Sequence, residues 1–204
     1  SQHSARRSAV YLLDQVLGEG RLMSDLITGG ALDALDPPDR ARAQRLAVDT
    51  LRGLERADRL INRHVRKTPQ LHVFNILRIG TVELCHGGDA HGVVNEMVNI
   101  VGKDRRYGKL KGLVNAVLRK IADHDHKSWN DLRLPRLQNW LRAPLVDAYG
   151  AQAIGAMEKV HFAGAPLDIT AKGDVTASAG KLGGVVLPTG SIRLADPGQV
   201  SALP

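Results

Sequence analysis

Apolar residues recur at helical spacing through the first 123 residues, and this pattern limits the fold more than any other feature of the sequence. Over residues 4–17, 90–101 and 109–122, apolar side chains fall every three or four positions. This spacing places them on one face of an α-helix. No alternating strand pattern occurs before residue 123. The sequence therefore predicts an all-helical domain over residues 4–123.

Two more helices are expected in the middle of this domain. Asp36 followed by Pro37 is a typical N-cap and first turn, and it opens a helical pattern that runs to about residue 65. Gly53 inside this pattern is expected to mark a bend or a close helix crossing. A further helix is predicted over 69–85.

The composition changes after residue 123. Residues 124–133 begin with a polar, unperiodic stretch and are predicted to be a linker. In residues 134–204 the pattern predicts a helical pair followed by an incomplete α/β unit. Its helices are expected over 135–149 and 151–162, and its short strands over 166–171, 184–187 and 191–194. The predicted fold class is therefore an all-α bundle followed by a small partial α/β segment.

Composition narrows the possible functions. Aromatic residues make up only 3% of the chain, which favours a core of aliphatic side chains between helices and leaves few platforms for stacking RNA bases. The single cysteine cannot form an internal disulfide, and no apolar run is long enough to span a membrane, so a cytoplasmic protein is expected. The net charge of +7 favours a polyanion partner, although a solvated basic surface is the alternative.

Basic residues fall into three clusters. They are Arg6 and Arg7; a long row of Arg40, Arg42, Arg45, Arg52, Arg56, Arg59, Arg63, Arg66 and Lys67; and Lys103, Arg105, Arg106, Lys109 and Lys111. The last two lysines lie at a predicted helix N-terminus, where the backbone N–H groups favour a phosphate. Ordinary surface pairing, such as Glu55 with Arg59, also fits the long row.

Several short motifs resemble those of NusB-like domains. They are ARRSA at 5–9, RAQRL at 42–46 leading to TLR at 50–52, ILRIG at 76–80, AHGVVNEMV at 90–98 and GLVNAVLR at 112–119. Their order and spacing also match. The resemblance covers residues 4–123 and implies an RNA-binding helical bundle that is able to form a homodimer.

Two NusB-like families fit these motifs: the free-standing transcription antitermination factor, and the N-terminal region of Sun/Fmu-type (RsmB-like) 16S rRNA cytosine-5 methyltransferases. The continuation through residues 134–167 favours the second. That resemblance implies 16S ribosomal RNA as the partner and S-adenosylmethionine as the cofactor of a longer parent enzyme. The chain carries no Gly-rich strand-to-helix turn of the G-x-G type and no Pro-Cys or Thr-Cys motif, so no catalytic or cofactor residue is assigned and the fragment itself is expected to be non-catalytic. A protein–protein adaptor is the third alternative.

The resemblance implies that the arginine-rich start of the first helix contacts RNA. The predicted RNA-binding residues are Arg6, Arg7, Arg42, Arg45, Arg105, Arg106, Lys109 and Lys111. For Arg45 and Arg78, a structural role between helices remains open beside RNA contact. Cys85 is expected to be a core residue, and no metal site is assigned to the histidines.

Overall fold

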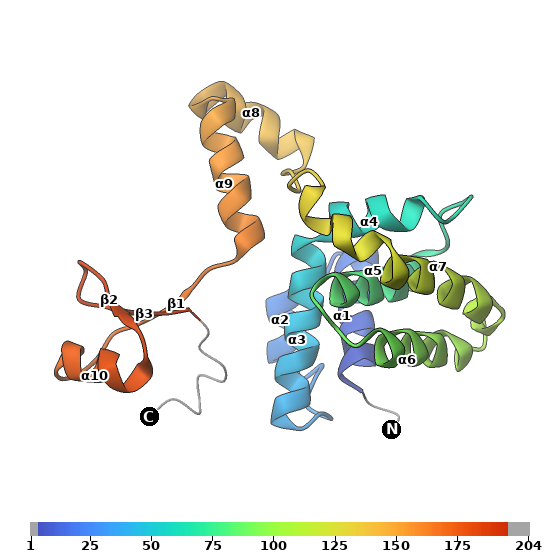
Figure 1. Cartoon of the computed structure of the whole chain (residues 1–204), viewed down its shortest axis with the longest axis horizontal. Helices are drawn as coiled ribbons and strands as arrows, with labels where there is room; N and C mark the ends of the chain where they lie inside the picture. The colour runs from blue at the N-terminus through green and yellow to red at the C-terminus, as the bar shows by residue number, and fades with distance from the viewer. Residues whose placement is uncertain (1–3, 196–204) are drawn as a thin grey trace. The chain divides into compact units, whose positions relative to one another are not determined.

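The computed structural model describes residues 4–195, which form two compact units divided after Glu158 (Figure 1). The first unit is entirely helical, and α9, which begins in it, extends past the division. Its elements are α1 (Ala5–Glu19), α2 (Met23–Thr28), α3 (Pro37–Arg52), α4 (Leu54–Asn62), α5 (Leu71–Cys85), α6 (Ala90–Gly102), η1 (Gly108–Leu110), α7 (Lys111–Asp123), η2 (Asp125–Asp131), α8 (Asn139–Tyr149) and α9 (Ala151–Ala163). The predicted fold class, an all-helical start followed by a small α/β segment, is confirmed.

Helix α5 is the centre of the first unit. Every residue from Val73 to Val82 is buried, because α1, α3, α4, α6, α7 and η2 all pack around this helix. A helix that is apolar on all sides is stable only when neighbours cover it completely. The helices that pack around α5 each bury apolar residues in the same core.

Two glycines allow close approach between elements. A Cβ at Gly80 of α5 would lie 2.9 Å from both methyl groups of Leu118, so only glycine lets α7 come this near. Gly53 separates α3 from α4, and a Cβ there would lie 2.9 Å from the ring of Trp129. The helical pattern is therefore interrupted at Gly53, and the absence of a side chain there leaves room for the ring of Trp129.

The expected linker is ordered over most of its length. Residues Asp125–Asp131 form the 3₁₀ helix η2, and Trp129 within it is only 4% exposed. The guanidinium of Arg56 donates to the carbonyl oxygens of Trp129 at 2.8 Å and Arg133 at 3.2 Å. This segment is therefore part of the helical core; one buried aromatic ring outweighs its polar composition.

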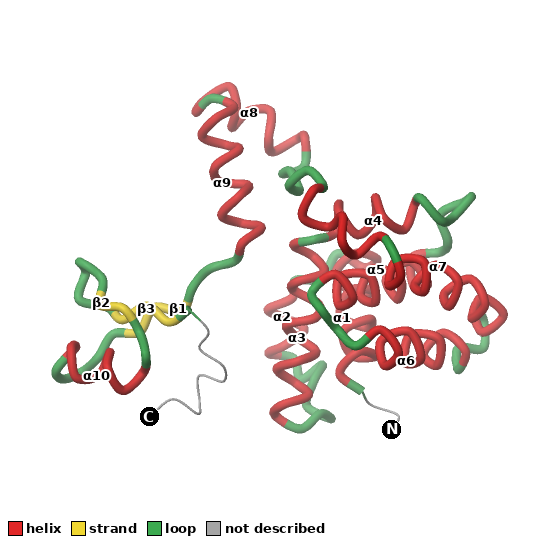
Figure 2. Tube along the Cα trace, in the orientation of Figure 1, coloured by secondary structure: helices red, strands yellow, loops and turns green. Residues whose placement is uncertain are grey.

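The second unit contains a small antiparallel sheet. Its elements are β1 (Leu167–Ile169), α10 (Val175–Leu182), β2 (Val185–Val186) and β3 (Ile192–Leu194), and β3 lies between β1 and β2 (Figure 2). Ala179, Ile192 and Leu194 form its buried core. Asp168 and Arg193 pair across β1 and β3 with N–O distances of 2.7 Å. The three predicted strands are confirmed in shortened form, whereas α10 was not predicted.

No helix within residues 4–195 has both the length and the apolar character that crossing a membrane requires.

Candidate nucleic-acid interface

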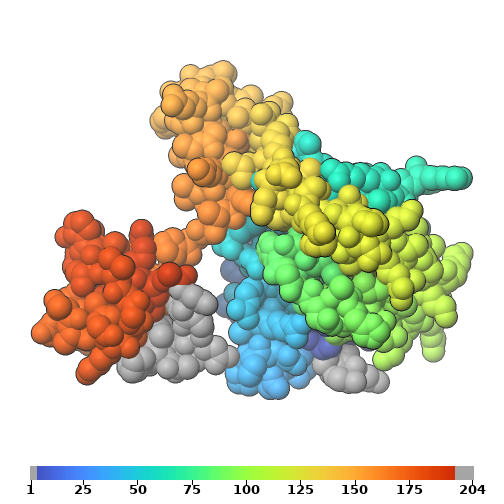
Figure 3. Space-filling model, in the orientation of Figure 1, coloured from blue at the N-terminus to red at the C-terminus, as the bar shows by residue number. Residues whose placement is uncertain are grey.

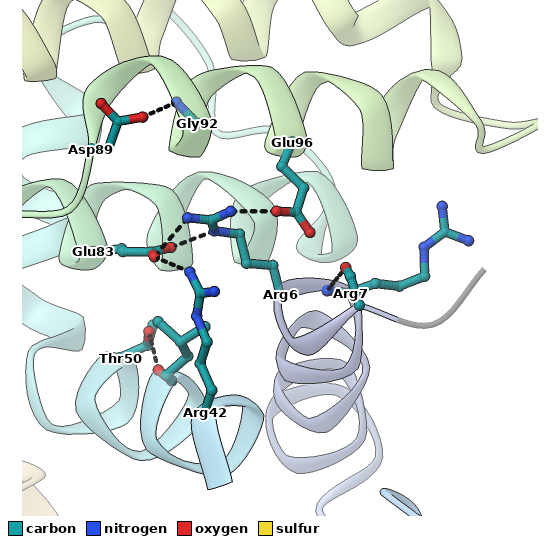
Figure 4. Close-up of polar contacts among 10 residues, drawn as sticks. Arg6, Arg7, Arg42, Thr50, Glu83, Asp89, Gly92 and Glu96 are labelled. Atoms are coloured by element: carbon teal, nitrogen blue, oxygen red, sulfur yellow. Dashed lines mark hydrogen bonds and ion pairs between the residues drawn. The ribbon is translucent and has the colours of Figure 1, made fainter. Parts of the chain in front are cut away.

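Arg6 lies inside the helical unit and is held by two carboxylates. Its side chain donates to Glu83 through Nε at 2.7 Å and Nη2 at 2.8 Å, and it also pairs with Glu96 (Figure 4). Arg42 reaches the same Glu83 at 3.0 Å. These contacts join α1, α3, α5 and α6. The prediction that Arg6 and Arg42 bind RNA stays untested. The structure places both in one ion-pair network, with Arg6 buried and Arg42 exposed at its edge.

Electrostatics favour the charged form of this network. Burial alone would lower the pKa of Arg6, but hydrogen bonds and attraction from Glu83 and Glu96 outweigh it and raise that pKa. Burial alone would raise the pKa of Glu96, yet hydrogen bonds from Ser4 and Arg6 lower it. The network therefore links α1, α3, α5 and α6 through charge-assisted hydrogen bonds.

Arg7 differs from its neighbour. Its backbone N–H donates to the N-cap side chain of Ser4 at 3.2 Å, and its guanidinium points away from the Arg6 network (Figure 4). Within residues 4–195 its side chain forms no ion pair. It lines a small cavity of about 210 Å³ together with His72 and Lys103. Asp14 and Asp104 line the same cavity, so Arg7 lies near carboxylates with which it forms no ion pair.

Most arginines of the long row have internal partners. Arg56 binds backbone carbonyls, and Arg40, Arg52, Arg59 and Arg63 pair with the acidic groups Asp33, Asp49, Glu55 and Asp125 respectively. The expected pair of Glu55 with Arg59 is confirmed at 3.1 Å. Three exposed cations of the row form no ion pair with any part of the chain that the structure describes. They are Arg45 on α3, Arg66 and Lys67.

Arg78 resolves the alternative that the sequence left open. It is 8% exposed, donates to both carboxylate oxygens of Asp58 at 2.7 and 2.8 Å and to Asn75 at 2.9 Å, and lies over the ring of Phe74. Its Nε, Nη1 and Nη2 atoms each donate a hydrogen bond, and the bonds to Asp58 join α4 to α5. Arg78 is therefore a structural residue.

The third basic cluster surrounds a cleft of about 400 Å³. Three cations line the cleft, Lys67 from the segment between α4 and α5 and Arg106 and Lys109 from the segment between α6 and α7. Both segments lie at the same end of the helical unit, at the right of Figures 1 and 3. Arg105 and Lys111 are exposed beside them. None of these five cations forms an ion pair with any residue between 4 and 195.

The loop that carries these cations has a fixed shape. Oδ1 of Asp104 accepts the backbone N–H groups of Arg106 at 2.7 Å and Tyr107 at 2.9 Å. The ring of Tyr107 stacks on His72 with centroids 5.5 Å apart, and Nδ1 of His72 lies 2.6 Å from Asp14. The stacked pair therefore anchors the basic loop to α1 and α5.

The anchor at His72 should depend on pH. The hydrogen bond to Asp14 raises the pKa of His72; burial and Arg7 oppose this, while the charges of Asp14 and Asp104 add to it. Because the pKa is raised on folding, the stabilisation is complete below the ordinary histidine pKa of about 6.5 and is lost as the pH rises through the higher folded value.

We expect His72→Gln to destabilise the protein more at low pH than at high pH, because glutamine gains no charge. Urea unfolding of the unaltered protein and of His72→Gln, at pH values below and above the pKa of His72 in the folded protein, measures the difference in stability. A difference that does not change with pH would contradict the assignment.

Lys67, Tyr107 and His72 belong to this surface, although they are not among the RNA-binding residues predicted from the sequence. Lys67 falls in the long row of basic residues, and its separation from Arg106 along the chain hides their proximity in space. Tyr107 did carry a signal, since it is the one aromatic residue inside the basic stretch 103–111.

Comparison with known proteins identifies the helical unit. Residues 3–123 match the model of the NusB family, which is more than half of the chain. The chain belongs to the NusB family. The predicted resemblance is thus confirmed over the range in which the motifs were found. The residues that line the basic cleft lie within this matched range.

The curated relatives extend beyond the NusB domain. Ribosomal RNA small subunit methyltransferase B of Thermus thermophilus is 35% identical over 188 residues, which cover 89% of this chain and 44% of the relative. A protein of Mycobacterium tuberculosis named as a putative methyltransferase is 30% identical over 196 residues, which cover 80% of this chain and 41% of the relative. The chain thus spans less than half the length of these relatives.

The described residues do not fit S-adenosylmethionine. The one sheet within residues 4–195 is antiparallel throughout, so it lacks the parallel strand, glycine-rich turn and helix that hold a nucleotide cofactor in doubly wound folds.

Burial raises the pKa of Cys85 to about 12, and the nearby charge of Asp125 adds to this, so the half-buried thiol stays protonated at neutral pH. No group of residues suited to a metal occurs within residues 4–195.

Proposed function

We propose that the NusB domain of this chain binds ribosomal RNA through the basic cleft and its rim, as the N-terminal RNA-binding region of an S-adenosylmethionine-dependent rRNA cytosine-5 methyltransferase. The name of the Thermus relative supports ribosomal RNA of the small subunit, which contains the 16S molecule, as the partner class. Transfer of the methyl group would be the task of residues outside 4–195.

One observation carries this proposal. Among the described residues, seven arginines of the domain pair with carboxylates, whereas Lys67, Arg105, Arg106, Lys109 and Lys111 form no ion pair and lie together at one end. When unpaired cations of a protein neutralise RNA phosphates, the counterions condensed on the RNA are released. This release supplies a large share of the affinity for RNA. Arg7 and Lys103 also form no ion pair within residues 4–195, and they line the neighbouring cavity together with Asp14 and Asp104.

The proposal predicts a strongly salt-dependent affinity that the cleft residues supply. Replacing Lys67, Arg106 and Lys109 together with alanine should weaken binding to small-subunit ribosomal RNA about a hundredfold at roughly 0.1 M salt. The slope of log K against log salt concentration should fall by about 2 to 3, because each lost phosphate contact contributes about 0.7 to 0.9. Filter binding over a salt series measures both quantities.

A matched triple variant separates this surface from general charge. Arg119, Lys120 and Lys127 are exposed cations outside the cleft, and their replacement with alanine removes the same charge. We expect this control to lose less than half as much of the salt slope. Equal losses in the two triple variants would contradict a specific interface, and no salt-dependent binding by the unaltered chain would favour a protein–protein adaptor.

A further inference from the structure

We propose that the basic cleft is a subsite for a single unpaired nucleotide, with the base inside the cleft and its flanking phosphates on the cations at the rim. This inference rests on the RNA binding proposed above and adds the form of RNA that the site selects. The cleft volume of about 400 Å³ falls within the roughly 300–1,000 Å³ range of pockets for small ligands.

The lining of the cleft is divided by chemistry. Pro69, Leu110 and Leu113 supply apolar surface, and Tyr107 adds an aromatic ring. Phosphate contacts alone require no apolar surface, since they need only donors and positive charge. A bound nucleotide needs a flat apolar neighbour for its base, and its phosphates must be able to leave the pocket toward positive charge.

Two flat groups lie together in this lining. The guanidinium carbon of Arg106 is 5.3 Å from the centroid of the Tyr107 ring. Bases stack on tyrosine rings and on guanidinium planes, with little dependence on sequence. A base that stacks beside Tyr107 and Arg106 would leave the positive charge of Arg106 close to the phosphate of the same nucleotide.

The stacking platform is held in place before any ligand arrives. Tyr107 has its backbone fixed by Asp104 and its ring backed by His72, which is itself held by Asp14. Preorganised groups lose little entropy on binding, so more of the contact energy appears as affinity. A base that is paired and stacked within a duplex cannot enter this cleft, and the site should therefore prefer single-stranded RNA.

The test compares single-stranded and duplex RNA of about 12 nucleotides, a length within the footprint of single-strand binders. Tyr107→Ala should weaken binding of the single strand roughly tenfold and change binding of the duplex by less than twofold, because stacking acts only on unpaired bases. Tyr107→Phe keeps the ring and should restore single-strand binding. Tyr149→Ala removes a tyrosine that is 66% exposed on α8 and should have no effect.

An RNA strand with abasic sites in place of its bases makes the test independent of folding defects in the variants. It keeps every phosphate, and the unaltered protein should bind it as weakly as Tyr107→Ala binds the intact strand. Equal affinity for intact and abasic strands, or equal losses for single strand and duplex in Tyr107→Ala, would overturn the subsite while leaving RNA binding in place. Absence of binding to every RNA would overturn the proposed function itself.

Discussion

Arg6→Ala should lower the free energy of unfolding of the helical unit by about 3–5 kcal/mol. The substitution leaves Glu83, with a side chain only 12% exposed, and Glu96 without their shared cation. Arg42 still pairs with Glu83 and limits the loss toward the lower end of this range. Chemical denaturation followed by circular dichroism at neutral pH measures the change.

The neighbouring arginine is the control for this prediction. Arg7→Ala removes the same side chain one position along α1, where no carboxylate is paired with it, and should change stability by no more than about 0.5 kcal/mol. When only folded protein is compared, Arg7→Ala should weaken RNA binding more than Arg6→Ala does. Arg6→Ala that is as stable as Arg7→Ala would contradict the internal role of Arg6.

Trp129→Ala should destabilise the protein by about 3–5 kcal/mol, the usual cost of removing a large buried aromatic ring. The ring lies against Gly53 and edge-on to His86 at a centroid distance of 5.8 Å. The guanidinium carbon of Arg56 lies 5.7 Å from its centroid. Thermal and chemical unfolding measure the loss.

The other tryptophan of the chain provides the comparison. Trp140 on α8 is 76% exposed, so Trp140→Ala should leave stability nearly unchanged. If the segment around Trp129 were a mobile linker, as its composition suggested, the two substitutions would have equal and small effects. That result would exclude η2 from the helical core.

The helices could be predicted because their signals are local. Periodic apolar residues and the Asp36–Pro37 start gave the helix positions, and Gly53 gave the break between α3 and α4. η2 escaped prediction because a single tryptophan makes no periodic pattern. α10 escaped because its alanine, serine and glycine residues produce a weak apolar stripe, although Asp174 and Gly183 cap its ends.

The site was less predictable because it depends on where neighbouring side chains point. Arg6 and Arg7 are adjacent in sequence, but successive residues on a helix differ in direction by about 100°. One therefore faces Glu83 and Glu96, and the other faces outward. The partners that neutralise Arg6 are more than 75 positions away, at 77 and 90 residues of separation. Only the tertiary structure distinguishes a paired cation from a free one.

Ultraviolet cross-linking of the chain to small-subunit ribosomal RNA, with mass-spectrometric mapping of the linked peptides, tests the RNA-binding surface most directly. Binding at the cleft predicts cross-links in residues 66–70 and 103–113, with Tyr107 among the linked residues. Cross-links confined to α3 around Arg42 and Arg45, or to residues 159–195, would contradict it.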